Sequence, residues 1–319
     1  MTLKRALKSL AGEVIEFAKK DFNKKAYFFT ALLITILLIA NYEFGLEEHI
    51  VRESFSVGKS WWVVPIFYLV IYFAAAIPTL IFRKEFGTLR SPAFYLKSSF
   101  FIVLYGFSLG FYKYSDLTFV GLLDTEVVYV TMLISQLKGA VIFFLPVLLM
   151  KLTIDKQING IYGIARHPKH LNAYLMLFVV MVPFLILTSF TGDFLKAYPQ
   201  FCPWYFEDIF GMSTWEYTVL YELAYALDFV MTELVFRGML VIGLMAVMGR
   251  SAVLPMVALY CTIHFAKPVV EAISSIFGGY ILGALAYQTR HIWGGIMVHI
   301  CIAITMEIMG FVHYYLLKN

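Results

Sequence analysis

Four ionisable side chains in the second half of the chain have the types and spacing needed to cleave a peptide bond. Glu233 and Arg237 lie four residues apart in an apolar run from about 217 to 249, so they share one face of a helix. His264 and His299 lie in two further apolar runs. A carboxylate and two imidazoles can activate a water for attack on a carbonyl and then protonate the leaving amine. The same groups could instead form a His₂-carboxylate zinc site, with scattered ligands because the sequence has no HExxH motif.

Each of these residues also has a purely structural interpretation. Glu233 and Arg237 alone would be a buried ion pair that fixes the register of a helix. A lone histidine in an apolar helix more often makes a hydrogen bond to a neighbouring helix than a catalytic contact. An ionisable residue surrounded by lipid is costly, however, and usually has a partner and a function. One glutamate and two histidines on three separate apolar segments therefore favour a catalytic site.

The elements that must position these residues are membrane helices. Of the 319 residues, 61% are hydrophobic and only 14% are charged, whereas soluble domains carry about 25% charged residues. The apolar residues form continuous runs, which argues against a β-barrel. We therefore predict an all-α, polytopic bundle with eight or nine transmembrane helices. The candidate spans cover residues 26–44, 61–82, 98–112, 127–150, 170–189, 217–249, 252–264, 268–287 and 292–317. The run 252–264 is too short to cross unless it is extended or partly re-entrant.

Charged residues in the loops predict the orientation of the bundle. Residues 1–25 hold seven Lys and Arg and are expected to form an amphipathic helix at the cytosolic membrane surface. Basic and acidic loops then alternate, which places the N-terminus in the cytoplasm. The net charge of +4 belongs to this pattern, and no nucleic-acid partner is expected. Residues 26–216 are predicted to supply the first membrane helices and 217–319 the core that carries the site, within one continuous membrane domain.

The longest loop, residues 191–216, is rich in aromatic residues and contains two prolines, Pro199 and Pro203. Two interpretations are open: a belt of aromatic side chains at the membrane interface, or a lid over the bundle. The aromatic belt is the favoured prediction because Trp and Tyr are enriched at that depth.

The order and spacing of these residues resemble those of the CAAX-protease and bacteriocin-processing (CPBP, or Abi) family of intramembrane endopeptidases. The resemblance rests on Glu-x-x-Phe-Arg-Gly at 233–238, Tyr260-x-x-x-His264 and the later His299, and it covers roughly 217–310. It implies that Glu233, Arg237, His264 and His299 form the active site. It also implies a peptide or lipidated protein, such as one with a prenylated C-terminus, as substrate. We expect an integral, multi-pass protein of a bacterial cytoplasmic membrane, in contact with membrane lipid.

Three positions depart from the family pattern Glu-Glu-x-x-x-Arg, Phe-x-x-x-His and His-x-x-x-Asn/Asp. Thr232 occupies the place of the first glutamate, usually taken as the base that activates water. Tyr260 replaces phenylalanine, which is a mild change. Ala303 occupies the place of an Asn or Asp that helps to hold the oxyanion, and losing one such donor typically costs about 10²–10³ in rate. Possible substitutes for the missing acid are Glu233 itself, Glu307 and Glu271.

The sequence thus predicts an intramembrane endopeptidase in which Glu233 and His264 activate water, His299 polarises the scissile carbonyl and Arg237 orients Glu233. No cofactor is required, or else a zinc ion is bound. The departures at Thr232 and Ala303 leave a second interpretation open, a catalytically impaired membrane scaffold or immunity-type protein of the same fold. A third, a small-solute transporter, is disfavoured because no inverted repeat is visible in the sequence.

Overall fold

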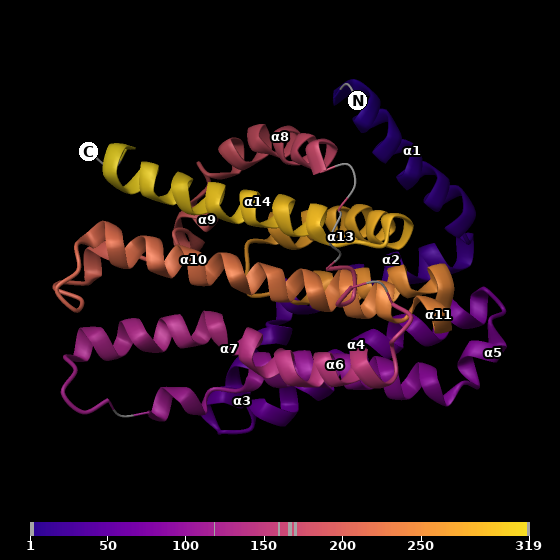
Figure 1. Ribbon diagram of the computed structural model, residues 1–319, viewed down its shortest axis with the longest axis horizontal. Helices are drawn as coiled ribbons and strands as arrows, with labels where there is room; N and C mark the ends of the chain where they lie inside the picture. Colours follow the sequence, from indigo (N-terminus) through magenta and orange to yellow (C-terminus); the bar gives the residue numbers. More distant parts are fainter. Residues whose placement is uncertain (1–2, 118, 159, 165–167, 169–170, 318–319) are drawn as a thin grey trace.

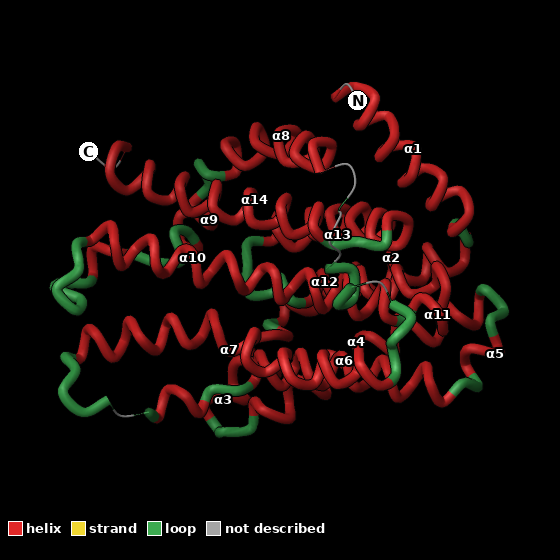
Figure 2. The backbone as a smooth tube through the Cα atoms, viewed as in Figure 1, coloured by secondary structure: helices red, strands yellow, loops and turns green. Residues whose placement is uncertain are grey.

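Helices account for almost all of the regular structure in this protein. The computed structural model describes residues 3–117, 119–158, 160–164, 168 and 171–317. Within these residues, eight helical segments are long and apolar enough to cross a membrane, and no strand is formed. The helices run along the long axis of the molecule, with most of the loops at their two ends (Figures 1 and 2). The predicted all-α polytopic bundle is confirmed, with eight candidate membrane spans.

The long helices are α2 (Lys24–Phe44), α4 (Ser60–Phe82), α6 (Pro92–Gly110), α7 (Asp124–Thr153), α8 (Leu171–Thr188), α10 (Thr214–Glu233), α13 (Val269–Thr289) and α14 (Trp293–Val312). They are joined and extended by shorter elements. These are η1 (Glu48–Arg52), α3 (Glu53–Ser56), α5 (Phe86–Leu89), η2 (Lys113–Asp116), α9 (Gly192–Ala197), η3 (Pro203–Tyr205), η4 (Leu234–Gly243), α11 (Met245–Met248), η5 (Gly249–Ala252), α12 (Val253–Thr262) and η6 (His313–Leu317). The chain begins with α1 (Leu3–Asp21).

The apolar run expected as one helix over 217–249 is divided into three parts. The α-helix α10 ends at Glu233, and the chain continues as the π-helix η4, all ten residues of which are buried. The short helix α11 then leads to a turn at Gly249, where φ is +54°. In the segment from Thr214 to Thr262, 72% of the most apolar 18-residue stretch is buried inside the protein. The corresponding share is 17% in each of α2, α7 and α8. The segment that carries Glu233 and Arg237 therefore lies inside the bundle.

The short helix α12 does not cross the membrane alone. Its ten residues are all buried and correspond to about 15 Å of helix, roughly half of a hydrocarbon core. It packs against α13, α4 and α2 and ends inside the bundle, just before His264. The expectation that the run 252–264 is too short to span is therefore consistent with the fold.

The N-terminal helix α1 packs against α13 and α8. Leu10 and Phe17 are buried, and the Phe17 ring lies edge-on to Tyr287 of α13, with 5.3 Å between the ring centroids. At the end of α1, Asp21 forms an ion pair with Arg83, which follows α4. Arg83 Nη1 lies 2.6 Å from Asp21 Oδ1. The amphipathic helix expected from the sequence thus uses its apolar face to bind the bundle.

The loop between α8 and α10 folds into the bundle. Tyr198 and Phe201 are buried, and Phe201 stacks on Tyr221 of α10, with 4.6 Å between the ring centroids. The backbone N–H of Gln200 donates to both carboxylate oxygens of Glu307 on α14, at 3.0 and 2.9 Å. Tyr198 and Phe201 thus pack against the helices, whereas Tyr205 of the same loop is exposed. The aromatic-belt and lid interpretations of this loop stay predictions.

Candidate active site

Glu233 and Arg237 form a fully buried ion pair at the junction of α10 and η4. The Arg237 Nη1 atom lies 2.9 Å from Glu233 Oε1, and the two side chains are 1% and 0% exposed. The pairing predicted from the i,i+4 spacing is confirmed. Two charges without solvent are stable only when they are paired and further hydrogen-bonded, so the remaining contacts of this carboxylate decide what the pair can do.

The same carboxylate oxygen also contacts His299. The His299 Nδ1 atom of α14 lies 3.1 Å from Glu233 Oε1. A carboxylate only accepts hydrogen bonds, so Nδ1 carries a proton, and in the neutral ring Nε2 then keeps its lone pair. His299 is 14% exposed at its side chain, and its ring packs on Phe229, with 4.5 Å between the ring centroids. Glu233 therefore fixes the tautomer of His299 and leaves a basic nitrogen available.

The second carboxylate oxygen of Glu233 lies against the backbone of Gly295. Oε2 has no hydrogen-bond partner among the described residues. A Cβ atom added at Gly295 would lie only 2.3 Å from it. Gly295 precedes His299 by one helical turn, so α14 presents a bare backbone to the carboxylate and the imidazole one turn later. The absence of a side chain at 295 allows Glu233 to reach His299.

Replacing Gly295 with alanine is therefore expected to displace the Glu233 carboxylate and to break its contact with His299. Overpacking of this kind typically costs about 1–3 kcal/mol of stability, and any hydrolytic activity should fall by at least about tenfold. The matched control is Gly278→Ala on α13, where nothing lies within 4 Å of the added atom. Thermal unfolding and peptide cleavage of the two variants test this. If the two variants have the same melting temperature and the same cleavage rate, the Glu233 carboxylate does not lie against Gly295 as described.

His264 lies in the turn after α12 and joins the site through Tyr260. Its Nδ1 atom is 2.8 Å from the backbone carbonyl of Tyr260, and a carbonyl only accepts, so Nδ1 carries the proton here too. The ring of His264 packs edge-on to that of Tyr260, with 4.8 Å between the centroids. Nε2 of His264 is a second basic nitrogen.

Tyr260 is the residue that the sequence analysis underrated. The Cζ atom of Arg237 lies 4.1 Å from the centroid of its ring. Its hydroxyl oxygen lies 3.4 Å from Nε2 of His299. The one available signal was its position four residues before His264, which places both on one helical face. The structure thus places Arg237 and His299 each in direct contact with Glu233 and connects His264 to this group through Tyr260.

The other sequence candidates have different surroundings. Glu307 is bound by the backbone N–H of Gln200, and Glu271 accepts a 3.0 Å hydrogen bond from the Tyr198 hydroxyl. Both carboxylates thus bind the loop between α8 and α10. Thr232 is half-buried, and Ala303 is buried in a cluster with aromatic residues of α7 and α10. Neither Thr232 nor Ala303 supplies an acid or an amide.

The zinc alternative stays a prediction. Both histidines use Nδ1 for a hydrogen bond within the protein, as zinc-bound histidines commonly do, while Oε1 of Glu233 is shared between Arg237 and His299. Among the described residues, no group of three His, Cys, Asp or Glu side chains is arranged to hold a metal ion. No step proposed below uses a metal.

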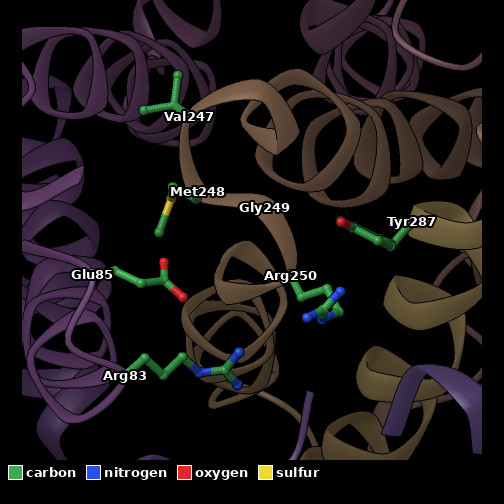
Figure 3. Close-up of a pocket in the computed structure, with 7 residues that line it drawn as sticks. All are labelled: Arg83, Glu85, Val247, Met248, Gly249, Arg250 and Tyr287. Carbon is green, nitrogen blue, oxygen red and sulfur yellow. The ribbon is translucent and has the colours of Figure 1, made fainter. Parts of the chain in front are cut away.

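A separate pocket of about 270 Å³ lies at the ends of α4 and α13. Figure 3 shows the side chains of Arg83, Glu85, Arg250 and Tyr287 around it, beside the turn at 247–249. Its lining contains none of Glu233, Arg237, His264 and His299. Arg83 is already paired with Asp21, and Glu85 accepts a 2.7 Å hydrogen bond from Ser251. These contacts hold the helix ends together, away from the candidate active site.

One family model matches the segment that carries the site. Residues 214–305 match the model of the Rce1-like family, described as type II CAAX prenyl endopeptidase Rce1-like. The match covers all four predicted site residues and agrees with the resemblance to CPBP proteins seen in the sequence, which is confirmed over this segment. Searches of curated proteins and of solved structures gave no match.

Proposed function

We propose that the protein is an intramembrane endopeptidase that hydrolyses a membrane-associated or lipidated peptide with water activated by histidine and glutamate. The observation that carries the proposal is the contact of Glu233 with His299 inside a membrane bundle. Catalytic acid–histidine pairs have this arrangement: a buried carboxylate orients an imidazole, and the other ring nitrogen can take a proton. The family match over 214–305 supports the same reaction class.

The contacts suggest a role for each residue. Glu233 holds His299 as the Nδ1–H tautomer and stabilises the imidazolium that forms when Nε2 takes a proton from water. His264 presents a second imidazole, whose Nε2 can accept a hydrogen bond from the attacking water and position it, while His299 returns its proton to the leaving amine. Arg237 neutralises the charge of Glu233 and holds its carboxylate in place. In this assignment Glu233 acts through His299, which compensates for the acid missing at Thr232.

The surroundings of the site indicate the class of substrate. The site lies within a bundle of eight candidate membrane spans, and apolar walls exclude competing water. A peptide that carries a lipid can partition into the membrane and approach from there. The family description names prenyl CAAX peptides, so the proposed substrate is a peptide with a prenylated cysteine near its C-terminus. Thr232 and Ala303 support the alternative, a catalytically impaired scaffold or immunity-type protein of this fold.

The test uses the purified full-length protein in liposomes with a fluorescence-quenched peptide that ends in a farnesylated Cys-a-a-X sequence. We expect release of the C-terminal fragment, identified by mass spectrometry, and at least about tenfold slower cleavage of the same peptide with an unmodified cysteine. Absence of cleavage across prenylated and unmodified peptides would overturn the endopeptidase proposal and favour the scaffold. Proton-coupled solute flux into the same liposomes without cleavage would favour the transporter.

A further inference from the structure

Tyr260 contacts three of the four candidate catalytic residues. Its ring lies under the guanidinium of Arg237, its backbone carbonyl accepts the hydrogen bond from His264, and its hydroxyl faces His299. The side chain is only 5% exposed. A phenol enclosed in an apolar bundle normally needs a hydrogen-bond partner, so the direction and strength of its hydrogen bond indicate what it can do.

The Tyr260 hydroxyl is a donor with a weak partner. Because Nδ1 of His299 donates to Glu233, Nε2 of that ring is the acceptor and the phenol O–H is the donor. Their separation of 3.4 Å exceeds the usual length of such a bond, about 2.7–3.2 Å. Little free energy is therefore lost when the O–H turns toward a better acceptor. A carbonyl oxygen that becomes negatively charged beside Nε2 of His299 would be such an acceptor.

Arg237 strengthens the phenol as a donor. A guanidinium 4.1 Å from the ring centroid attracts the electron density of the ring, which withdraws charge from the hydroxyl oxygen. Hydrogen bonds to a developing oxyanion gain most in a buried site, where preformed donors replace water. The position of Arg237 over the ring thus serves the hydroxyl and the Glu233 carboxylate at once.

Position 303, where the similar family has an Asn or Asp, supplies no side-chain donor for this charge. Ala303, one helical turn after His299, has no polar atom in its side chain and lies in an aromatic cluster. The nitrogens of Arg237 are buried and have no hydrogen-bond partner among the described residues; Nη1 lies 2.9 Å from Glu233 Oε1, and the guanidinium lies over the Tyr260 ring. In the Nδ1–H tautomer, Nε2 of each histidine is an acceptor and cannot donate to the oxyanion. We propose, on the basis of the endopeptidase function above, that Tyr260 is a catalytic residue whose hydroxyl donates a hydrogen bond to the oxygen of the scissile carbonyl as that oxygen becomes negative.

The reaction balances without any further reactant. The water oxygen forms a bond to the carbonyl carbon, the π electron pair moves onto the carbonyl oxygen, and the water proton moves to Nε2 of a histidine. Tyr260 keeps its proton throughout and only donates a hydrogen bond to the oxyanion. When the carbonyl re-forms, the C–N bond breaks, and the imidazolium returns its proton to the leaving amine.

Tyr260→Phe tests the proposal because it removes one oxygen atom and keeps the ring that packs on Arg237 and His264. We expect kcat for the prenylated peptide to fall about 10²–10³-fold, the usual cost of one oxyanion donor. KM and the melting temperature should stay close to those of the wild type. The matched control is Tyr105→Phe, which changes another buried tyrosine whose ring lies edge-on to Phe236 at 5.2 Å and should leave kcat unchanged.

A binding measurement separates this role from a structural one. A phosphonate analogue of the scissile amide carries a tetrahedral oxyanion, so Tyr260→Phe should weaken its binding by the factor lost in kcat/KM and leave product binding unchanged. Wild-type kcat in Tyr260→Phe, or a loss confined to KM, would overturn the assignment of Tyr260 while the endopeptidase proposal stands. A wild-type protein that cleaves no peptide would instead overturn the function on which the assignment rests.

Discussion

Glu233→Gln is expected to lower kcat for a cleaved peptide by about 10³–10⁴-fold, although only one atom changes. The amide cannot hold the Nδ1–H tautomer of His299 in the way a carboxylate does, and it cannot stabilise an imidazolium. In catalytic triads the equivalent change of acid to amide costs about 10⁴. The 3.1 Å contact between Glu233 Oε1 and His299 Nδ1 is the physical basis of this prediction. Single-turnover cleavage, measured well below the melting temperature of the variant, gives the rate of the chemical step.

A double variant distinguishes this role of Glu233 from an independent one. If Glu233 acts through His299, then Glu233→Gln with His299→Ala should be about as slow as His299→Ala alone, because residues that act as a unit are strongly non-additive. Losses that multiply would show that Glu233 activates water directly, as the sequence analysis expected. Wild-type rates in Glu233→Gln would remove this carboxylate from the mechanism.

Arg237→Met is expected to reduce the free energy of unfolding by about 3–5 kcal/mol, because it leaves a carboxylate without its counter-charge in the interior. Arg237 and Glu233 are 1% and 0% exposed, so water cannot compensate. The double variant Glu233→Leu with Arg237→Met should recover most of that stability while remaining inactive, since an apolar pair of similar volume replaces a buried ion pair at little cost. Thermal unfolding in one detergent at one protein concentration provides the measurement.

The exposed pair Glu48–Arg52 provides the control for this cycle. It has the same i,i+4 spacing and a similar separation of 3.0 Å, but its side chains are 52% and 62% exposed. Arg52→Met should leave the melting temperature unchanged, because solvent screens such pairs. If Arg237→Met unfolds at the same temperature as Arg52→Met, the Glu233–Arg237 pair does not contribute to the fold as described.

The sequence was sufficient for the class of fold and for the contact within one helix. Continuous apolar runs identify membrane helices because the length of a helix must match the thickness of the membrane, and the pair Glu233–Arg237 follows from helical periodicity alone. The contact between Glu233 and His299 spans 66 residues. It depends on how two helices cross and at what depth, which periodicity does not determine. The sequence alone therefore could not decide whether Glu233 and His299 form one site or lie apart with separate structural roles.

Gly295 and Tyr260 could not be assigned from the sequence for a related reason. Gly295 matters through the side chain that it lacks, and that is evident only once the Glu233 carboxylate is seen 2.3 Å from where a Cβ would stand. Tyr260 looks like a conservative replacement of phenylalanine until its hydroxyl is placed opposite Nε2 of His299. For the loop after α8, composition alone does not show which aromatic residues are buried. The carboxylate of Glu307, more than a hundred residues later, draws its backbone inward.

The complete burial of η4 has a consequence for how the sequence of this protein can change over evolution. A helix at the edge of a membrane bundle has one side that touches only lipid, where one apolar side chain can replace another at little cost. The ten residues from Leu234 to Gly243 have no such side, because neighbouring helices surround the π-helix completely. Substitutions should accumulate on α2, α7 and α8, which are buried least, and should be rare around the whole circumference of η4. The rate of sequence divergence along the chain should therefore follow how little of each helix is buried in the bundle.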